Sequence, residues 1–198
     1  MNSRDNLPEK SFYLRSDVVT IARELIGMKL CTCFDGNLTS GIITETEAYA
    51  GVTDKGSHAY NGCRTQRTEV MFREGGLAYI YLCYGMYSLF NVVTNAKDIP
   101  HAVLIRAIKP IDGIEIMLQR TGKQKVDKNF SNGPGKLAKA LGLHFLQTGT
   151  SLYGHEIWIE TTDFRYPEKE LSVTPRIGID YAGEDALLPY RFVLNGMK

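Results

Sequence analysis

The chain has 198 residues, of which 43% are hydrophobic and 23% are charged, proportions that are ordinary for a soluble globular protein. This composition argues against disorder beyond the first residues, and the length suits one domain that buries its core without disulfides or metal staples. The net charge of +1 excludes neither acidic nor basic partners, so a protein that binds nucleic acid would have to segregate its charges onto different faces.

The segment Met1–Lys10 is polar and lacks the apolar stretch of a secretory signal, and no apolar run approaches the ~18 residues of a membrane span. The cysteines form no C-x-x-C pair, which gives a zinc site little support and indicates free thiols in a reducing compartment. They are Cys31, Cys33, Cys63 and Cys83. We therefore expect a cytoplasmic protein, associated with the nucleoid in a bacterium, that is not secreted, contacts no membrane and needs no metal or cofactor.

Helices and strands are predicted from hydrophobic periodicity and from the residues that cap or break them. The expected helices cover residues 16–27, 111–120 and 134–142. The expected strands cover residues 28–34, 40–49, 77–84, 87–94, 101–108, 156–161, 176–179 and 190–194. Residues 50–76 form a long loop with a short helical piece at 69–72, and a loop of that length is usually functional or disordered.

Antiparallel hairpins and separate blocks of helices predict an α+β fold, a single domain with one mixed or antiparallel curved sheet and flanking helices. The expected hairpin turns are Asp35-Gly36-Asn37 and Tyr84-Gly85-Met86-Tyr87. Residues 1–14 are expected to form a flexible N-terminal segment and residues 15–198 the domain itself.

The first candidate site lies in the strand expected at 40–49. Side chains of a strand alternate between its faces, so Glu45, Glu47 and Tyr49 share one face. A carboxylate beside an aromatic ring suits a site that stacks a flat ligand and activates a water molecule. An ordinary solvent-exposed strand face is the alternative, and the pattern alone favours it.

The second candidate site is a cluster of four tyrosines within residues 79–87. Tyr79 and Tyr81 share a strand face, whereas Tyr84 lies at the expected turn. The cluster is either a buried cross-strand ladder, a surface on which bases stack, or a hairpin tip that wedges base steps apart. Composition does not choose among these three.

Two further features complete the set. The run Ser131-Asn132-Gly133-Pro134-Gly135-Lys136 leads into a helix and is either a phosphate site or a plain helix cap with a solvated lysine. It does not match the P-loop pattern, which rejects a nucleoside-triphosphate site. His58 lies in the long loop, and the remaining histidines are scattered, so no metal cluster is implied.

Together these segments resemble the 3-methyladenine DNA glycosylase family of the alkyladenine, or methylpurine, type. The resemblance extends from about Ile21 to near the end of the chain, and its E-T-E-A-Y and Y-G-M-Y motifs are specific. The matching segments, in order, are 45–49, 57–60, 79–87 with Asn91, 103–107, 133–137 and 176–178. The fold that the family implies agrees with the α+β domain predicted above.

The resemblance implies a role for each matching residue. Glu47 is expected to be the general base that activates water, and Arg106 to help hold Glu47 and that water. The residues expected to form the pocket for a flipped base are Tyr49 on one wall, His58 and Tyr81 on the other, and Asn91, which would crowd the exocyclic amine of guanine.

Other residues are expected to contact DNA outside this pocket. Tyr84 is expected to intercalate into the gap left by the flipped nucleotide, with Met86 and Tyr87 along the minor groove. The residues expected at DNA phosphates are Arg64, Arg67 and Lys136.

The function implied is base-excision repair of double-stranded DNA by a monomer that flips damaged purines and hydrolyses the N-glycosidic bond. The expected bases are 3-methyladenine and 7-methylguanine, with hypoxanthine and ethenoadenine as further candidates. No lysine lies in a motif that suggests a Schiff-base nucleophile, so the enzyme is expected to be monofunctional and to leave an abasic site. The alternatives are a non-catalytic protein that binds damaged DNA on the same scaffold, and a module that stacks single-stranded or RNA bases.

Overall fold

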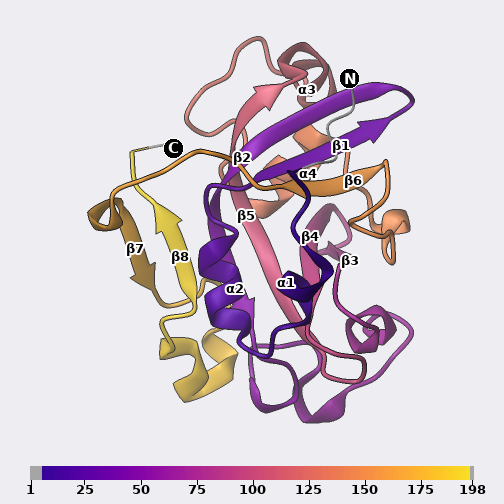
Figure 1. Cartoon of the computed structure of the whole chain (residues 1–198), viewed down its shortest axis with the longest axis vertical. Coiled ribbons are helices and arrows are strands. Elements are labelled where there is room, and N and C mark those ends of the chain that lie inside the picture. The colour runs from indigo at the N-terminus through magenta and orange to yellow at the C-terminus, as the bar shows by residue number, and fades with distance from the viewer. Residues whose placement is uncertain (1–5, 197–198) are drawn as a thin grey trace.

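Strand β2 (Asn37–Tyr49) is the longest strand of the computed structural model, and the rest of the sheet is built around it (Figure 1). The structure describes residues 6–196. Within this part, the strands form one eight-stranded antiparallel sheet in the order β3-β4-β5-β2-β1-β6, with β8 attached to β2 and β7 to β8. The other strands are β1 (Lys29–Phe34), β3 (Leu77–Cys83), β4 (Tyr87–Thr94), β5 (His101–Asp112), β6 (Ile157–Glu160), β7 (Leu171–Thr174) and β8 (Arg191–Leu194).

One edge of β2 pairs with β5, and its other edge is shared by two partners. β1 pairs with the first part of β2, up to Ile42, and β8 pairs with the segment Glu45–Glu47. The sheet therefore divides at β2, and the β1–β2 hairpin and the β7–β8 hairpin extend toward opposite sides of Figure 1. The sheet curls into a half-barrel within a single α+β domain, which confirms the predicted fold class.

The register between β2 and β5 is interrupted around Glu45, which lies opposite Ala107. Thr44 of β2 and Arg106 of β5 have no opposite residue in this strand pairing. Such bulges re-aim side chains and are frequent beside active sites. Here the irregularity brings Arg106 into contact with Glu45 and Glu47, on the same face of the sheet.

The main core lies on the face of the sheet that packs against the helices. Ile21 of α2 and Leu137 of α4 are fully buried there with Phe90 and Ile105 of the sheet. The helices are α1 (Lys10–Leu14), α2 (Val18–Glu24), α3 (Ile114–Thr121) and α4 (Pro134–Leu141). Within residues 6–196, no helix is both long enough and apolar enough to cross a membrane.

The opposite face of the sheet is covered in part by the loop 50–76. Val70 and Met71 of this loop pack against Tyr79 and Val93 in a second, smaller core. The loop carries η2 (Gly51–Thr53), η3 (Tyr60–Gly62) and η4 (Glu69–Phe72), all 3₁₀ helices, and η4 is the helical piece expected at 69–72. Further 3₁₀ helices in the described part of the chain are η5 (Phe145–Gln147), η6 (Glu168–Glu170) and η7 (Asp180–Leu187).

The helices α2 and α4 lie within the ranges 16–27 and 134–142 that the sequence predicts. The Asp17 carboxylate accepts hydrogen bonds from the backbone N–H groups of Val19 and Thr20, at 3.1 and 3.0 Å, and so caps α2. α4 begins at Pro134 and ends before Gly142, which adopts a left-handed conformation.

The expected helix at 111–120 is displaced, because β5 continues to Asp112 and pairs with Ser40 before α3 begins. The strand expected at 176–179 is wrong, since β7 lies earlier in the chain. Arg176 is buried in an ion pair, the Ile177 N–H bonds to a side chain, and residues 177–179 line a cavity, so this segment contributes to a site and does not join the sheet.

The N-terminal segment 1–14 was expected to be flexible. Its residues 1–5 lie outside the described part of the chain, whereas α1 buries the Tyr13 ring completely. The Tyr13 carbonyl accepts a hydrogen bond of 2.7 Å from the Asn95 N–H. These contacts concern α1 alone, and flexibility of the N-terminal segment stays a prediction.

The two glycines that flank α3 offer a test of the fold. Both have a left-handed backbone, but a Cβ at Gly113 would lie 2.1 Å from the Leu38 carbonyl oxygen, whereas one at Gly122 would meet nothing within 4 Å. We expect Gly122→Ala to lower the free energy of unfolding by about 1–2 kcal/mol through backbone strain. Gly113→Ala should cost a further ~1–3 kcal/mol through overpacking. Urea unfolding measures both, and equal losses would contradict the predicted contact.

Candidate active site

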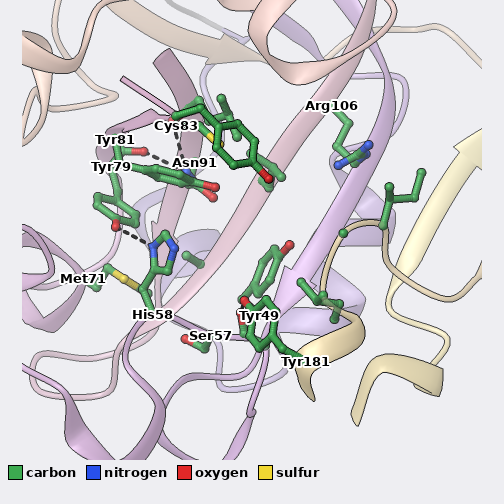
Figure 2. Close-up of a pocket in the computed structure, with 18 residues that line it drawn as sticks. Tyr49, Ser57, His58, Met71, Tyr79, Tyr81, Cys83, Asn91, Arg106 and Tyr181 are labelled. Atoms are coloured by element: carbon green, nitrogen blue, oxygen red, sulfur yellow. Dashed lines mark hydrogen bonds between the residues drawn. The ribbon is translucent and has the colours of Figure 1, made fainter. Parts of the chain in front are cut away.

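A cavity of about 370 Å³ opens on the face of the sheet opposite the main core. Its lining comes from β2, β3, β4 and β5, from the loop 50–76 and from the segment that leads into η7 (Figure 2). Figure 2 shows two aromatic walls that face each other, with Tyr49 on one side and Tyr79, Tyr81 and His58 on the other. This separation suits a flat ring held between aromatic side chains.

Glu47 is completely buried and lies behind the lining of this cavity, because it contacts three residues that line it, Tyr49, Arg106 and Ile177. Its Oε1 atom accepts a hydrogen bond of 2.9 Å from the Ile177 N–H, and its Oε2 atom accepts one of 2.9 Å from the Tyr49 hydroxyl. Arg106 Nε lies 3.3 Å from Oε1. A carboxylate has about four lone-pair sites, so these three contacts leave room for one water molecule. The burial of Glu45 and Glu47 rules out the alternative of a solvent-exposed strand face.

The protonation of Glu47 is set by two opposing effects. Burial raises the pKa of its carboxyl group, and the charge of Arg106 together with the bonds from Ile177 and Tyr49 opposes that rise. The net pKa lies above its usual value. A carboxylate with a raised pKa is a stronger proton acceptor, which is the property that a general base requires.

The wall opposite Tyr49 is rigid. The His58 ring lies edge-on to the Tyr81 ring, with centroids 4.6 Å apart, and His58 Nδ1 is 2.8 Å from the Tyr79 hydroxyl. Burial, helped by the charge of Arg67, lowers the pKa of His58 to about 4. The imidazole is therefore neutral near pH 7 and adds no charge to the pocket.

Asn91 is buried in the floor of the cavity. Its amide nitrogen donates to the backbone carbonyls of Tyr79 and Leu89, at 3.0 and 3.3 Å. The polar atom that it can offer a ligand is therefore its carbonyl oxygen, which accepts hydrogen bonds only.

The turn between β3 and β4 projects into solvent at the cavity mouth. Tyr84 is 88% exposed, has a left-handed backbone and also lines the cavity. Met86 and Tyr87 follow it and are largely exposed. Gly135 at the start of α4 packs so closely on Tyr87 that a Cβ there would lie 2.9 Å from its ring. The start of α4, which carries Lys136, thus lies beside the β3–β4 hairpin that carries Tyr87.

Arg64 and Arg67, both expected at DNA phosphates, differ in their surroundings. Arg64 is paired with Glu69 at 2.7 Å and with Asp98 at 2.9 Å, so its charge is already compensated by two carboxylates. Arg67 lies close enough to the pocket to affect the pKa of His58. Binding of phosphate by these arginines and by Lys136 stays a prediction.

Arg176 and Asp54 were given no role by the sequence, yet they support the site. The pair is completely buried, with distances of 2.5 and 2.8 Å between guanidinium nitrogens and carboxylate oxygens. The Arg176 guanidinium lies 4.8 Å from the centroid of the Tyr49 ring, and Arg176 directly precedes the N–H that binds Glu47. The resemblance marked the R-I-G segment, but no local pattern shows that a backbone N–H will serve as a donor.

Tyr181 at the start of η7 was also missed. It is 72% exposed, lines the cavity beside Tyr49 in Figure 2, and its hydroxyl donates to the Gly56 carbonyl at 3.3 Å. It therefore links η7 to the loop that carries His58. Within residues 6–196 no group of three or more metal-ligating side chains occurs, and all four cysteines are free.

The fold and site together indicate a class of protein, an enzyme whose cavity has two aromatic walls suited to a flat ring and a buried carboxylate behind them. Residues 11–198 match the family described as methylpurine-DNA glycosylase, and the chain belongs to this family. It is therefore a DNA glycosylase, an enzyme of DNA repair whose substrate is DNA. This confirms the family that the sequence motifs indicated.

Several bacterial relatives are similar over nearly their whole length. A protein of Chlamydia felis is 51% identical over 193 residues, which are 97% of each chain. Proteins of Chlamydia pneumoniae and Bacillus thuringiensis are each 47% identical, over 94% of both chains. All three are provisionally named 3-methyladenine DNA glycosylases.

The Arg176–Asp54 pair generates a prediction about stability. Asp54→Asn should lower the free energy of unfolding by about 3–5 kcal/mol, because it leaves the buried Arg176 charge without a partner. The double variant Asp54→Asn with Arg176→Met should lose less than Asp54→Asn alone, since it buries no unpaired charge. Denaturant unfolding of wild type and the two variants measures these losses, and a double variant that loses as much as Asp54→Asn alone, or more, would contradict the prediction.

Proposed function

We propose that this enzyme removes alkylated purines, above all 3-methyladenine and 7-methylguanine, from double-stranded DNA. We further propose that it acts as a monomer. The observation that carries the proposal is the buried Glu47, which contacts Arg106 directly behind a cavity with two aromatic walls.

The first step is extrusion of the damaged nucleotide. A base inside the duplex is out of reach, and unstacking it costs a few kcal/mol. Stacking on aromatic side chains returns ~1–3 kcal/mol per base, and Tyr49 and Tyr81 offer such walls. Tyr84, exposed at the tip of its hairpin, enters the vacated position in the stack and delays return of the base.

The second step is hydrolysis. The bond between C1′ of the sugar and the purine nitrogen breaks, and its electron pair neutralises the positive ring of the departing base. The oxygen of water bonds to C1′, and its proton passes to Glu47. The carboxylate also stabilises the positive charge that develops on the sugar. An alkylated purine is already cationic, so its departure needs no proton donor.

The product is an abasic site in an intact strand. Lysine is absent from the described residues that line the cavity, so the pocket holds no amine that could form a Schiff base with the sugar. This supports a monofunctional reaction in which water is the nucleophile.

The direct test is single-turnover base release from a duplex that carries one lesion. We expect wild type to release 3-methyladenine and 7-methylguanine faster than the neutral hypoxanthine and ethenoadenine. Glu47→Gln should slow release by about 10²–10⁴-fold while lesion binding persists, because it removes the proton acceptor. Glu160→Gln, which alters an ion-paired carboxylate on β6, is the matched control and should leave the rate unchanged.

The possible outcomes separate the hypotheses. A wild type that binds lesion DNA without releasing any base would favour a non-catalytic damage sensor. A strand break made by purified protein without heat or alkali would overturn the monofunctional reaction.

The pH dependence of the reaction follows from the pKa values of two groups. Glu47 acts in its ionised form, and its raised pKa means that activity is lost as the pH falls through a value above the usual ~4.3. His58, with a pKa of about 4, stays neutral and causes no second change in the rate between pH 5 and 8. For a cationic base we therefore expect a rate that rises with pH to a plateau. The residual rate of Glu47→Gln should lack that rise. A rate that still rises with pH in this variant would contradict the role of Glu47 as the general base.

A further inference from the structure

Glu45 lies two residues before Glu47 on the same strand face, and its side chain is only 4% exposed. Its Oε1 atom accepts two guanidinium hydrogen bonds, one of 2.9 Å from Arg106 Nε and one of 2.7 Å from Arg191 Nε. The same Arg106 nitrogen lies 3.3 Å from Glu47. Arg106 is therefore shared between two carboxylates and lies closer to Glu45.

The position of Arg191 depends on the branch of the sheet. Arg191 of β8 lies opposite Glu47 in the pairing with β2, and its guanidinium also donates to the Thr174 hydroxyl of β7 at 3.2 Å. Neither Glu45 nor Arg191 is among the residues that line the cavity. They therefore do not touch a bound base, and any effect that they have must pass through Arg106 and Glu47.

We propose that Glu45, together with Arg191, is a positioning residue of the reaction, which holds Arg106 so that Glu47 keeps an oxygen lone pair for water. This inference rests on the proposed role of Glu47 as general base. The shared Arg106 can stabilise the charge of Glu47 without forming a bidentate pair that would occupy both of its oxygens.

The carboxyl group of Glu45 is held in its ionised form. Burial alone would raise the pKa of its carboxyl group, but the hydrogen bond from Arg191 and the charges of Arg106 and Arg191 outweigh burial and hold that pKa below its usual value. Glu45 is thus ionised wherever the enzyme works, and it supplies a fixed negative charge next to the base.

Glu47 is surrounded by ionisable groups from several elements. The guanidiniums nearest to it belong to Arg106 of β5 and Arg191 of β8, with that of Arg176 beyond Tyr49. The phenols of Tyr49 and Tyr81 face it from β2 and β3. Among the described residues, Arg106 pairs with the carboxylates of Glu45 and Glu47, so loss of the Glu45 charge would leave it paired with Glu47. Arg106 would then pair with Glu47 alone, lower its pKa and compete with water for its oxygens.

The experiment compares the pH profile of single-turnover 7-methylguanine release in wild type and three variants. Glu45→Gln should lower the plateau rate by about tenfold to a hundredfold, because a small misplacement of catalytic groups has effects of that size. The fall of its rate at low pH (the acid limb of the profile) should move to lower pH, so the ratio of the rate at pH 5 to the plateau rate rises. Arg191→Gln removes a positive charge and should move the limb to higher pH. Glu160→Gln, remote on β6, should change neither quantity.

A purely structural role would lower the plateau in both variants without moving the two limbs in opposite directions. An unchanged profile of Glu45→Gln, or limbs that move in the same direction, would overturn the proposal. If thermal unfolding shows that Glu45→Gln does not fold, the profile of Arg191→Gln decides alone, and an unmoved limb overturns the proposal.

Failure of this inference is distinguishable from failure of the proposed function. If Glu47→Gln releases the base at the wild-type rate, the general-base role is wrong. If Glu47→Gln is inactive but Glu45→Gln behaves as wild type, only the positioning role of Glu45 is wrong.

Discussion

The structure depends on keeping one carboxylate, that of Glu47, charged in the protein interior. An isolated buried carboxylate would take up a proton instead of paying the cost of desolvation, so it needs donors on every side. Its donors come from three separate parts of the chain, namely Tyr49 on β2, Arg106 on β5 and the Ile177 N–H beyond β7. The branched sheet and the interrupted register between β2 and β5 are the features that bring these three groups together.

The donors that keep Glu47 ionised also compete with water for its oxygens. A stronger pair with Arg106 would stabilise the charge further and would make the carboxylate a weaker base. In the proposed role, Glu45 limits this competition, because it accepts the shorter of the two Arg106 contacts and so keeps Arg106 from pairing fully with Glu47. The strands β7 and β8 themselves have no residue in the lining of the cavity, yet β8 contributes through Arg191, which bonds to the same oxygen of Glu45.

Sequence reasoning succeeded where the signal is local and failed where it depends on distant partners. Strand alternation placed Glu45, Glu47 and Tyr49 on one face, and the capping residues located α2 and α4. A bulge shifts register by one residue and leaves no periodic mark, so alternation alone could not place Arg106. The isoleucines of residues 176–179 imitate a strand, but this segment lines the cavity with Ile177 49% exposed and Ile179 buried, and it joins no sheet.

The balance of charges around the pocket bears on which purines the enzyme prefers. The guanidiniums of Arg106, Arg176 and Arg191 are matched by the carboxylates of Glu45, Glu47 and Asp54. The neutral His58 ring adds no charge. A cationic purine therefore meets aromatic faces, and the guanidiniums of Arg106, Arg176 and Arg191 are offset by carboxylates, which favours its binding.

A neutral purine lacks that advantage and also needs a proton to leave. The hydroxyl of Tyr49 is bonded to Glu47, and His58 is paired with the hydroxyl of Tyr79, so these groups are already engaged. Burial further raises the pKa of each of the two phenols, which makes them weaker acids. The same buried environment that makes Glu47 a better base thus makes its neighbours poorer acids, and the proposed preference for cationic bases follows from that asymmetry.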